Sequence, residues 1–493
     1  MKKSLFEQII LYDYRYLIGY ATLALIGLYG LFWRLGSLLP GFSRYEAEYL
    51  VSFDQTFSSI AANPLYWPHK LLSQQATQWL GASELTARLP SALLGLAGLV
   101  LFFIIIRHRF KRRVAMVGVL LLSTSSWWLA SARLARPEIM LPLMMLLIAL
   151  LARLTLETQK GQWLILLGVA VGIAFYVPLL PYVVIIGSLV SYSIIRKTAA
   201  EFETKWKIAF YLVLLGLLAP LGAAIIQDGQ VGRDLLSIPV DWPSLSQYTD
   251  NIKDTVASLF WAAREFAPLN LGTLPFLDIF TVAMLILGFY YLDHEISRSL
   301  TQFLIFGLIA LLLILSINPL PGFSVVLIPF IYTLVAAGIV MLFSQWYEIF
   351  PKNPIARMAV FLPTVFLLGA VVWYHHTRYF VAAPRSPNII KTFPPLSAAI
   401  GDFLEIAPSA SQSVILTTDE EMLIAQAAAK TYPATQITSV ASAAFGQPNL
   451  AITHNAFEAL DSSDVQLAKK TKLNVLYSSY SSQPIVLWYT TAE

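Results

Sequence analysis

The sequence contains no cysteine, and few of its residues carry charge. Without cysteine there is no disulfide framework, no thiol chemistry and no cysteine-ligated metal site, so the redox compartment stays undetermined. Charged residues make up 13% of the 493 residues and apolar residues 57%, with a mean hydropathy of +0.66. Long apolar runs recur between residues 17 and 374, which is more than a soluble protein can bury. The composition therefore predicts a polytopic α-helical membrane protein.

Windows of about twenty apolar residues predict eleven membrane spans. Pro178 and Pro181 mark a break between two short helices, because proline removes a backbone donor and clashes inside a helix. The predicted spans cover residues 16–34, 88–106, 114–131, 139–153, 162–177, 179–195, 208–226, 275–292, 299–317, 322–343 and 355–374.

The basic loops predict which way the spans are oriented. Residues 107–113 and 196–207 are rich in Lys and Arg, and Lys2, Lys3 and Arg15 fall on the same side of the predicted membrane. The positive-inside rule then places the N-terminus in the cytoplasm and everything after residue 375 outside the cytoplasm. We expect no cleaved signal peptide, because no clear small-residue cleavage site follows the first apolar run.

The composition becomes much more polar near residue 376, which predicts two domains, residues 1–375 in the membrane and residues 376–493 as an extracytoplasmic α/β domain. The second domain has capping-box spacing at Thr418 and Glu421, before a helix over 422–430. It has no phosphate-binding glycine motif, so we expect a structural or acceptor-guiding role. Its predicted strands are Val414–Thr417, Gln436–Val440, Leu450–Thr453, Asn474–Ser478 and Ile485–Tyr489.

Two large outer loops follow from this layout, residues 35–87 and 227–274. In the first, residues 56–61 and 71–79 mix apolar and polar side chains at helical spacing, which predicts helices lying in the membrane interface. The same loop brings His69 and Lys70 to the outer surface, although a lone histidine is more often structural than functional. In the second, Arg264 precedes a span, where its planar fork of donors suits a lipid phosphate.

An acidic segment, Ser43–Tyr49, lies immediately outside the first span, where charge is costly. On a helix, the spacing of Glu46 and Glu48 lets only one of them face inward. Arg133 and Arg136 lie in a short outer loop that the positive-inside rule disfavours, beside Glu138. Either these arginines snorkel to lipid headgroups or the two segments meet in an acidic active site.

The order of these motifs is similar to that of a known family. The acidic segment, then residues 88–95, then residues 132–138, then Gly172–Tyr176 followed by Pro178 resemble polyprenyl-phosphate-dependent glycosyltransferases of the GT-C architecture. Those relatives include the protein O-mannosyltransferases and the lipid A aminoarabinose transferases. The resemblance implies a GT-C-like helical fold with an outer C-terminal domain.

The resemblance also implies site residues. The family's first outer loop reads Asp-Glu-Ala-x-Tyr, with the aspartate as base; here Tyr45 takes its place, while Glu46 and Tyr49 match. The family's Arg-x-Asp corresponds to Arg136-Pro137-Glu138, and residues 319–323 stand where the family has a late Arg-Tyr.

The expected chemistry is transfer of a sugar from a polyprenyl phosphate to an acceptor hydroxyl. A carboxylate would take the hydroxyl's proton, and cations would stabilise the departing phosphate. The predicted roles are Glu46 as base with Glu48 as its substitute, Glu138 orienting acceptor or metal, Arg88, Arg133, Arg136 and Arg264 on the phosphate, and Tyr49, His69, Lys70 and Tyr176 on the substrate.

Several points stay open at this stage. A divalent metal is not certain, although Glu46, His69 and Glu138 are candidates to converge on one. The acceptor is a lipid, a glycan or a protein; membrane lipids are expected partners, and nucleic acid is not. Because Tyr45 replaces the aspartate, a second hypothesis is a catalytically impaired homologue that binds lipid-linked sugars or assists assembly. A secondary transporter is a weaker third, since the acids lie in outer loops and no internal repeat is evident.

Overall fold

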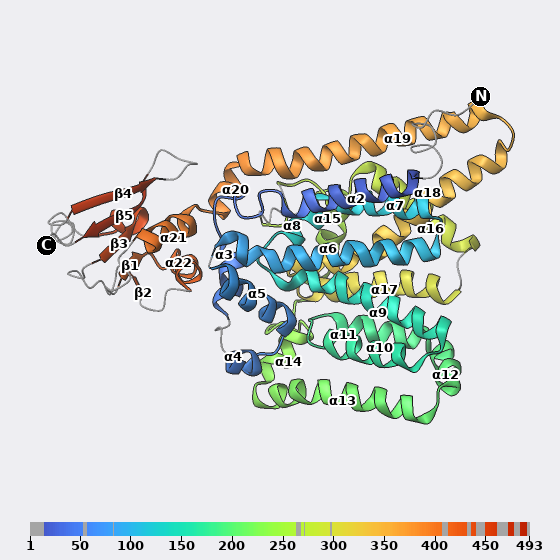
Figure 1. The fold of residues 1–493 in the computed structure, drawn as a ribbon, viewed down its shortest axis with the longest axis horizontal. Coiled ribbons are helices and arrows are strands. Elements are labelled where there is room, and N and C mark those ends of the chain that lie inside the picture. The colour runs from blue at the N-terminus through green and yellow to red at the C-terminus, as the bar shows by residue number, and fades with distance from the viewer. Residues whose placement is uncertain are drawn as a thin grey trace.

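The computed structural model describes residues 14–52, 57–81, 83–262, 268–270, 272–295, 298–406, 413–430, 435–439, 449–460, 472–477 and 484–490. Within these residues, long apolar helices lie side by side, and a small sheet stands at one end of the bundle (Figure 1). The helices of the bundle are α2 (Arg15–Phe32), α6 (Glu84–Arg109), α7 (Arg112–Thr124), α8 (Ser126–Ala132), α9 (Met140–Thr158), α10 (Gly161–Ala174), α11 (Leu180–Val190), α12 (Tyr192–Glu201), α13 (Thr204–Gln227), α16 (Ile279–Glu295), α17 (Arg298–Ile317), α18 (Ile328–Ile349) and α19 (Pro354–His376).

The bundle confirms the predicted membrane segments. Five described helices are long and apolar enough to span a membrane, and two helix pairs, α7 with α8 and α11 with α12, pass the same test together but are bent by 63° and 78° at a short break. The four shorter apolar helices α2, α10, α16 and α17 occupy the remaining predicted spans. The proline break is also confirmed, because α10 ends at Ala174 and α11 begins at Leu180.

Burial distinguishes the central helix from the outer ones. Most of α18 is buried inside the protein, whereas α13 and α19 are largely exposed and lie on opposite flanks of the bundle (Figure 1). Apolar side chains exposed on α13 and α19, such as Leu215 and Phe366, suit contact with lipid tails. Two small residues let α16 and α18 pack closely, because a Cβ on Gly288 or Gly338 would meet the other helix's backbone.

Short helices cover the end of the bundle next to the sheet. They confirm the predicted helices in the first outer loop, and they include α3, whose N-terminus is closed by a capping box between Ser43 and Glu46. These elements are α3 (Arg44–Val51), α4 (Phe57–Ala62), α5 (Trp67–Leu80), η2 (Pro137–Ile139), α14 (Gly229–Leu235), α15 (Leu245–Phe260) and η3 (Pro321–Leu327).

Beyond α19 the chain continues through short helices into a five-stranded sheet of order β2-β1-β3-β5-β4. Strands β2, β1 and β3 are parallel, whereas β5 runs antiparallel to both of its neighbours, so all five predicted strands are present. The elements are η4 (Thr377–Ala382), η5 (Ala383–Arg385), α20 (Pro387–Thr392), α21 (Leu396–Ile406), β1 (Ser413–Thr417), α22 (Met422–Ala429), β2 (Thr435–Ser439), β3 (Asn449–Thr453), α23 (His454–Glu458), β4 (Lys472–Tyr477) and β5 (Pro484–Thr490).

The capping box predicted at Thr418 is wrong. Helix α22 is present, but its N-terminus has no side-chain cap. Glu421 instead accepts hydrogen bonds from Thr453 Oγ1 at 2.6 Å and Asn455 Nδ2 at 2.7 Å. The Glu421 side chain therefore bonds to residues at and just after the end of β3 and does not cap helix α22.

The C-terminal region packs against the acidic segment. Ala47 and Leu50 of α3 share an apolar cluster with Phe403 of α21 and Ala428 of α22. Gly41 allows a close approach at this junction, because a Cβ there would lie 2.1 Å from the carbonyl oxygen of Pro394. The first outer loop and the C-terminal region are therefore in direct contact, although they lie far apart in the sequence.

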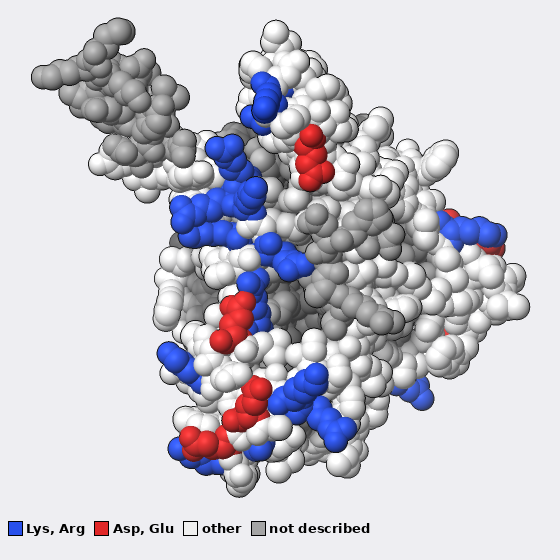
Figure 2. Space-filling view, turned by 90° about the vertical axis from the view of Figure 1, so that its right-hand side faces the viewer, with Lys and Arg blue, Asp and Glu red and all other residues white. Residues whose placement is uncertain are grey.

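Lys and Arg side chains gather at the end of the bundle that faces away from the sheet (Figure 2). Arg107, Arg109, Lys111, Arg112 and Arg113 are all exposed at the connection between α6 and α7. The predicted basic loops therefore meet on one face, which is the face that the positive-inside rule assigns to the cytoplasm.

Candidate active site

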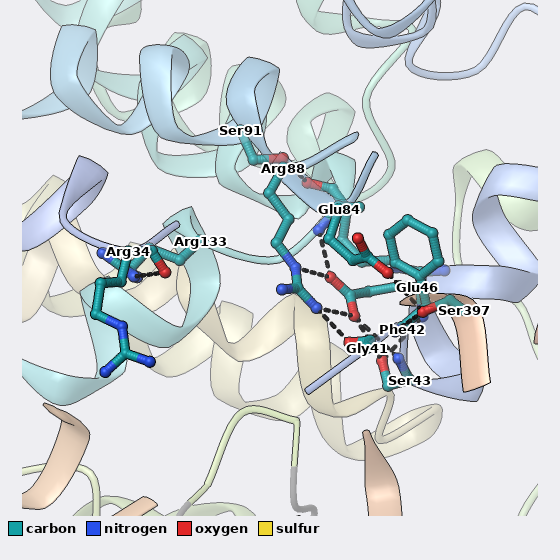
Figure 3. A network of polar contacts seen from close by, with 12 residues as sticks. Arg34, Gly41, Phe42, Ser43, Glu46, Glu84, Arg88, Ser91, Arg133 and Ser397 are labelled. Atoms are coloured by element: carbon teal, nitrogen blue, oxygen red, sulfur yellow. Dashed lines mark hydrogen bonds and ion pairs between the residues drawn. The ribbon is translucent and has the colours of Figure 1, made fainter. Parts of the chain in front are cut away.

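A buried ion pair joins helix α3 of the first outer loop to the beginning of α6. Glu46 Oε1 accepts from Arg88 Nε at 2.9 Å, and Oε2 accepts from Arg88 Nη2 at 3.1 Å (Figure 3). Both side chains are almost inaccessible, with exposed fractions of 0% and 1%. The Arg88 guanidinium also lies 5.9 Å from each of the ring centres of Phe42 and Phe393.

Glu46 has further donors on both oxygens. Ala135 N donates to Oε1 at 2.9 Å, while Ser43 donates to Oε2 from its amide at 3.0 Å and from its hydroxyl at 3.1 Å. Burial raises the pKa of Glu46, but Arg88 and these amides outweigh it and hold the pKa below its usual value. The arrangement joins loop 35–87 to loop 132–138 through an ionised carboxylate.

A second acidic group lies on the other side of α3. Glu138 Oε1 accepts from the Tyr45 hydroxyl at 2.9 Å and from Arg136 Nη2 at 2.5 Å. Oε2 has one longer contact among the described residues, to Arg136 Nε at 3.3 Å. The Arg136 guanidinium carbon stands 3.7 Å from the centre of the Tyr45 ring, and its Nη1 donates to the Tyr45 carbonyl. The Tyr45 hydroxyl thus orients a carboxylate that comes from residues 132–138.

The backbone of η3 closes this group from a third direction. A Cβ placed on Gly322 would lie 2.1 Å from the Tyr45 hydroxyl and 3.1 Å from Glu138 Cγ. Three segments far apart in the sequence, around residues 45, 137 and 322, therefore meet at one point. Only glycine at position 322 leaves room for them.

His69 continues the polar contacts inside the first loop. Its Nδ1 lies 2.9 Å from the Tyr49 hydroxyl and its Nε2 lies 2.8 Å from Ser91 Oγ. Since Ser91 donates to the carbonyl of Arg136, it accepts from Nε2–H, and Nδ1 is left to accept from Tyr49. Burial, followed by the charges of Arg136 and Lys70, lowers the pKa of His69 to about 3. His69 is therefore a neutral connector between the loops.

The remaining predicted substrate residues are largely engaged in protein contacts. Lys70 donates to the carbonyl of Asn63 at 2.7 Å, and burial, followed by Lys430, lowers its pKa to about 8. The Tyr176 hydroxyl donates to the carbonyl of Leu217, and the backbone carbonyl of Tyr176 accepts from Tyr66 N at 2.8 Å. The backbone carbonyl of Tyr176 thus ties the first outer loop to the bundle, whereas the Lys70 ammonium bonds within that loop.

Two charged residues lie apart from the cluster. Glu48 points to solvent and pairs with Arg44, which confirms that only one of the two glutamates on α3 faces inward. Arg133 donates to the carbonyls of Gly30 at 2.6 Å and Trp33 at 2.8 Å, at the C-terminal end of α2. Arg133 is thus buried at the end of α2, which does not fit the alternative that it snorkels to lipid headgroups.

Arg264 lies outside the described residues. Among the described residues, no group of three His, Asp or Glu side chains is placed to hold a metal ion. The three predicted metal candidates, Glu46, His69 and Glu138, each bind different partners and do not converge on one point.

Sequence reasoning missed several contributors. Ser91 and Gly322 carried no motif of their own, although both lie within segments that were singled out.

A further buried polar group joins Asp278, at the start of α16, to His375 Nε2 at 3.1 Å, and His375 Nδ1 to Ser126 Oγ at 3.1 Å. Asp278 also caps α16 through Thr281 N at 2.9 Å, which fits a structural junction between α8, α16 and α19.

Comparison with known proteins identifies the architecture. Residues 69–223 match the family model described as dolichyl-phosphate-mannose-protein mannosyltransferase. ArnT from Cupriavidus metallidurans, solved bound to undecaprenyl phosphate, is 13% identical, with a TM-score of 0.57 over 96% of this chain and 97% of ArnT. The Archaeoglobus fulgidus oligosaccharyltransferase in its apo form is 10% identical, with a TM-score of 0.50 over 99% of this chain and 75% of that one. No curated protein matches the chain in sequence. The chain therefore has the GT-C fold, and its residues 69–223 carry the sequence pattern of the protein mannosyltransferase family.

Proposed function

We propose that this protein transfers a sugar from a polyprenyl-phosphate donor to an acceptor hydroxyl, on the face of the membrane opposite the basic loops. The observation that carries the proposal is the meeting of Tyr45, Arg136 and Glu138 where the two outer loops join. The fold is consistent with it, since the structurally similar ArnT was solved with undecaprenyl phosphate.

Within this function, Glu138 is the better candidate for the base. A base needs a free lone pair within hydrogen-bond reach of the acceptor hydroxyl, and Glu138 Oε2 has only its 3.3 Å contact among described groups. Glu46, the base expected from the motif, has two or more donors on each oxygen and a guanidinium beside it. We assign Glu46 to holding the loops in register.

Arg136 is the better candidate for the donor phosphate. Its side chain keeps an exposed fraction of 18%, whereas Arg88 is 1% exposed and already neutralises Glu46. Arg133 is buried, and its guanidinium already donates to backbone carbonyls at the end of α2. A guanidinium beside the base would stabilise charge that grows on the departing phosphate as the sugar is transferred.

Replacing Glu138 with glutamine tests the assignment. Glu138→Gln keeps the size and loses the proton acceptor, so we expect kcat to fall by at least about 100-fold, which is the usual contribution of a general base. The purified protein in lipid nanodiscs is given polyprenyl-phosphate mannose and a panel of other polyprenyl-phosphate sugars, and transfer to acceptor is counted.

Glu48→Gln is the matched control, because Glu48 lies on α3 but faces solvent. Its transfer rate should stay close to that of the unchanged protein. If Glu138→Gln folds poorly, Glu138→Asp gives a second comparison. It keeps a carboxylate and should retain more activity than the glutamine variant. Transfer by folded Glu138→Gln at the unchanged rate would rule out Glu138 as the base.

One observation favours a second function. The motif glutamate is fully occupied by Arg88 and backbone amides, and Tyr45 stands where the family has its aspartate. A homologue that binds lipid-linked sugar without transferring it would show this pattern. Donor binding without turnover of any sugar in the panel would support that alternative.

A further inference from the structure

A separate pocket lies between the first outer loop and the C-terminal region. It has a volume of about 200 Å³ and is lined by residues of α3, α5, the start of α6, α21 and α22. Phe42 and Leu50 line it from the loop side, while Tyr45 and Tyr49 on α3 make their contacts with Arg136, Glu138 and His69. The pocket is therefore distinct from the group around Glu138.

Most polar groups of the pocket are hydroxyls and carboxylates, beside the amide of Gln74 and the ammonium of Lys430. Ser73 and Ser397 are 4% and 3% exposed and form its inner polar wall. Ser397 Oγ accepts from Phe42 N at 2.9 Å and donates to Glu84 Oε1 at 2.8 Å, which fixes Glu84 at the wall (Figure 3). Asp402 and Glu405 are exposed at the rim, and Lys430 reaches in from the end of α22.

This lining selects among ligand classes. No described group of three carboxylates or histidines converges on one point, so the acids do not build a metal cage. The volume is smaller than that of drug-sized ligand sites, which favours a compact ligand. Spread carboxylates and hydroxyls, with an ammonium at Lys430 that donates to the Leu50 carbonyl, suit a compact ligand with many hydroxyl groups.

We propose that this pocket binds one sugar residue other than the donor sugar. The inference rests on the proposed function for its meaning, because a glycan-bearing acceptor would then be held by the C-terminal region while its reactive hydroxyl extends toward Glu138. The pocket also touches the loop machinery. Ser73 Oγ lies 3.3 Å from His69 Nδ1, and Glu84 lies one helical turn before Arg88. A bound sugar would therefore stabilise the junction of both outer loops.

Gly401 offers a clean way to fill the pocket. It lines the cavity on α21, and a Cβ added there would meet nothing within 4 Å. Gly401→Leu should occupy the space without disturbing the packing around it. Gly369→Leu is the matched control, since Gly369 is also a helical glycine with open space at its Cβ, but it lies on the exposed face of α19.

The experiment measures binding of methyl glycosides of glucose, mannose, galactose and glucosamine to the full chain in nanodiscs by calorimetry. We expect at least one glycoside to bind the unchanged protein and Gly369→Leu equally. Gly401→Leu should raise its Kd at least tenfold, and Asp402→Asn severalfold. No binding of any glycoside to the unchanged protein, or equal binding by Gly401→Leu, would overturn the proposal.

A second measurement distinguishes acceptor sugar from donor sugar. Binding of polyprenyl-phosphate mannose should be unchanged in Gly401→Leu, and loss of donor binding in that variant would contradict a separate acceptor site. The readout does not need turnover, so Glu138→Gln should bind the glycoside normally. Failure of the transferase proposal would thus leave glycoside binding intact, and the reverse holds too.

Discussion

At the scale of single residues, the roles of the glutamates follow from their partners rather than from their place in a motif. Glu46 and Glu138 are both acidic residues beside an arginine, and both are buried. Glu46 receives backbone amides from two loops on top of its ion pair, whereas Glu138 receives a tyrosine hydroxyl and one guanidinium. A carboxylate surrounded by amides is stabilised as an anion, which suits structure better than proton transfer.

The stability of a Glu46→Gln variant follows from this difference. Removing the charge leaves Arg88 buried beside a neutral group, which typically costs about 3–5 kcal/mol. We therefore expect a clearly lower melting temperature in detergent, measured by intrinsic fluorescence, while Glu48→Gln should melt like the unchanged protein. An unaltered melting temperature in Glu46→Gln would contradict the structural role.

The pH dependence of the same variant has a defined sign. Because the folded-state pKa of Glu46 lies below its unfolded value of 4.5, the ion pair stabilises the fold above that pH. The stabilisation is lost as the pH falls through the lower folded pKa. The difference in melting temperature between the unchanged protein and Glu46→Gln should therefore shrink on acidification below pH 4.5.

At the scale of elements, helix α3 contacts both the C-terminal region and the group around Glu138. One face of this eight-residue helix meets α21 and α22 through Ala47 and Leu50. Another face carries Tyr45 and Tyr49 to Glu138 and His69, while Glu48 stays in solvent. Its geometry thus couples the C-terminal region to the group around Glu138.

Gly322→Ala tests the third segment of that group. The new Cβ would overlap the Tyr45 hydroxyl, so the bond from Tyr45 to Glu138 must break or η3 must shift. We expect transfer to fall about tenfold or more, since misplacing catalytic groups by 1 Å has effects of up to about 100-fold.

Gly222→Ala is the control for this substitution, because a Cβ at that position in α13 meets nothing within 4 Å. Both variants are assayed for sugar transfer and for melting temperature. Equal transfer by the two would show that the close approach at Gly322 has no bearing on the reaction.

At the scale of the whole molecule, the chain has a basic end and an opposite end that carries the sheet (Figures 1 and 2). The positive-inside rule predicts that the basic end faces the cytoplasm. The division into residues 1–375 and 376–493 stays a prediction of the composition change. The apolar contacts of α3 with α21 and α22 indicate that the two parts are held together on the outer side.

The lack of native cysteine makes the orientation directly measurable. Lys197→Cys places a thiol at the basic end, and Asp419→Cys places one between β1 and α22, both at exposed positions. In intact cells, a membrane-impermeant maleimide should label Asp419→Cys but should label Lys197→Cys only after permeabilisation. The unchanged protein gives the background, and the reverse pattern would invert the proposed topology.

The sequence by itself determined the features that depend on local composition. Apolar runs of sufficient length give spanning helices in lipid, because backbone groups there must bond internally, so the apolar helices of the bundle could be predicted from the sequence. The five short strands and the break at Pro178 follow in the same way from short runs of residues that favour strands and from proline geometry. The meeting of residues 43–49 with residues 132–138 was also predictable, because charge so close to a membrane needs a partner.

Only the tertiary structure decided which partner each charged group received. Helical spacing shows that Glu46 or Glu48 faces inward, but it does not reveal that Arg88 and two loops of backbone amides surround Glu46. The approach of Gly322 to Tyr45 and the docking of α21 beside α3 join segments hundreds of residues apart. Such contacts depend on packing over the whole chain, and no local pattern encodes them. The sequence therefore predicted that these segments meet, and the packing decided which carboxylate is surrounded by amides and which keeps an oxygen with a single long contact among the described residues.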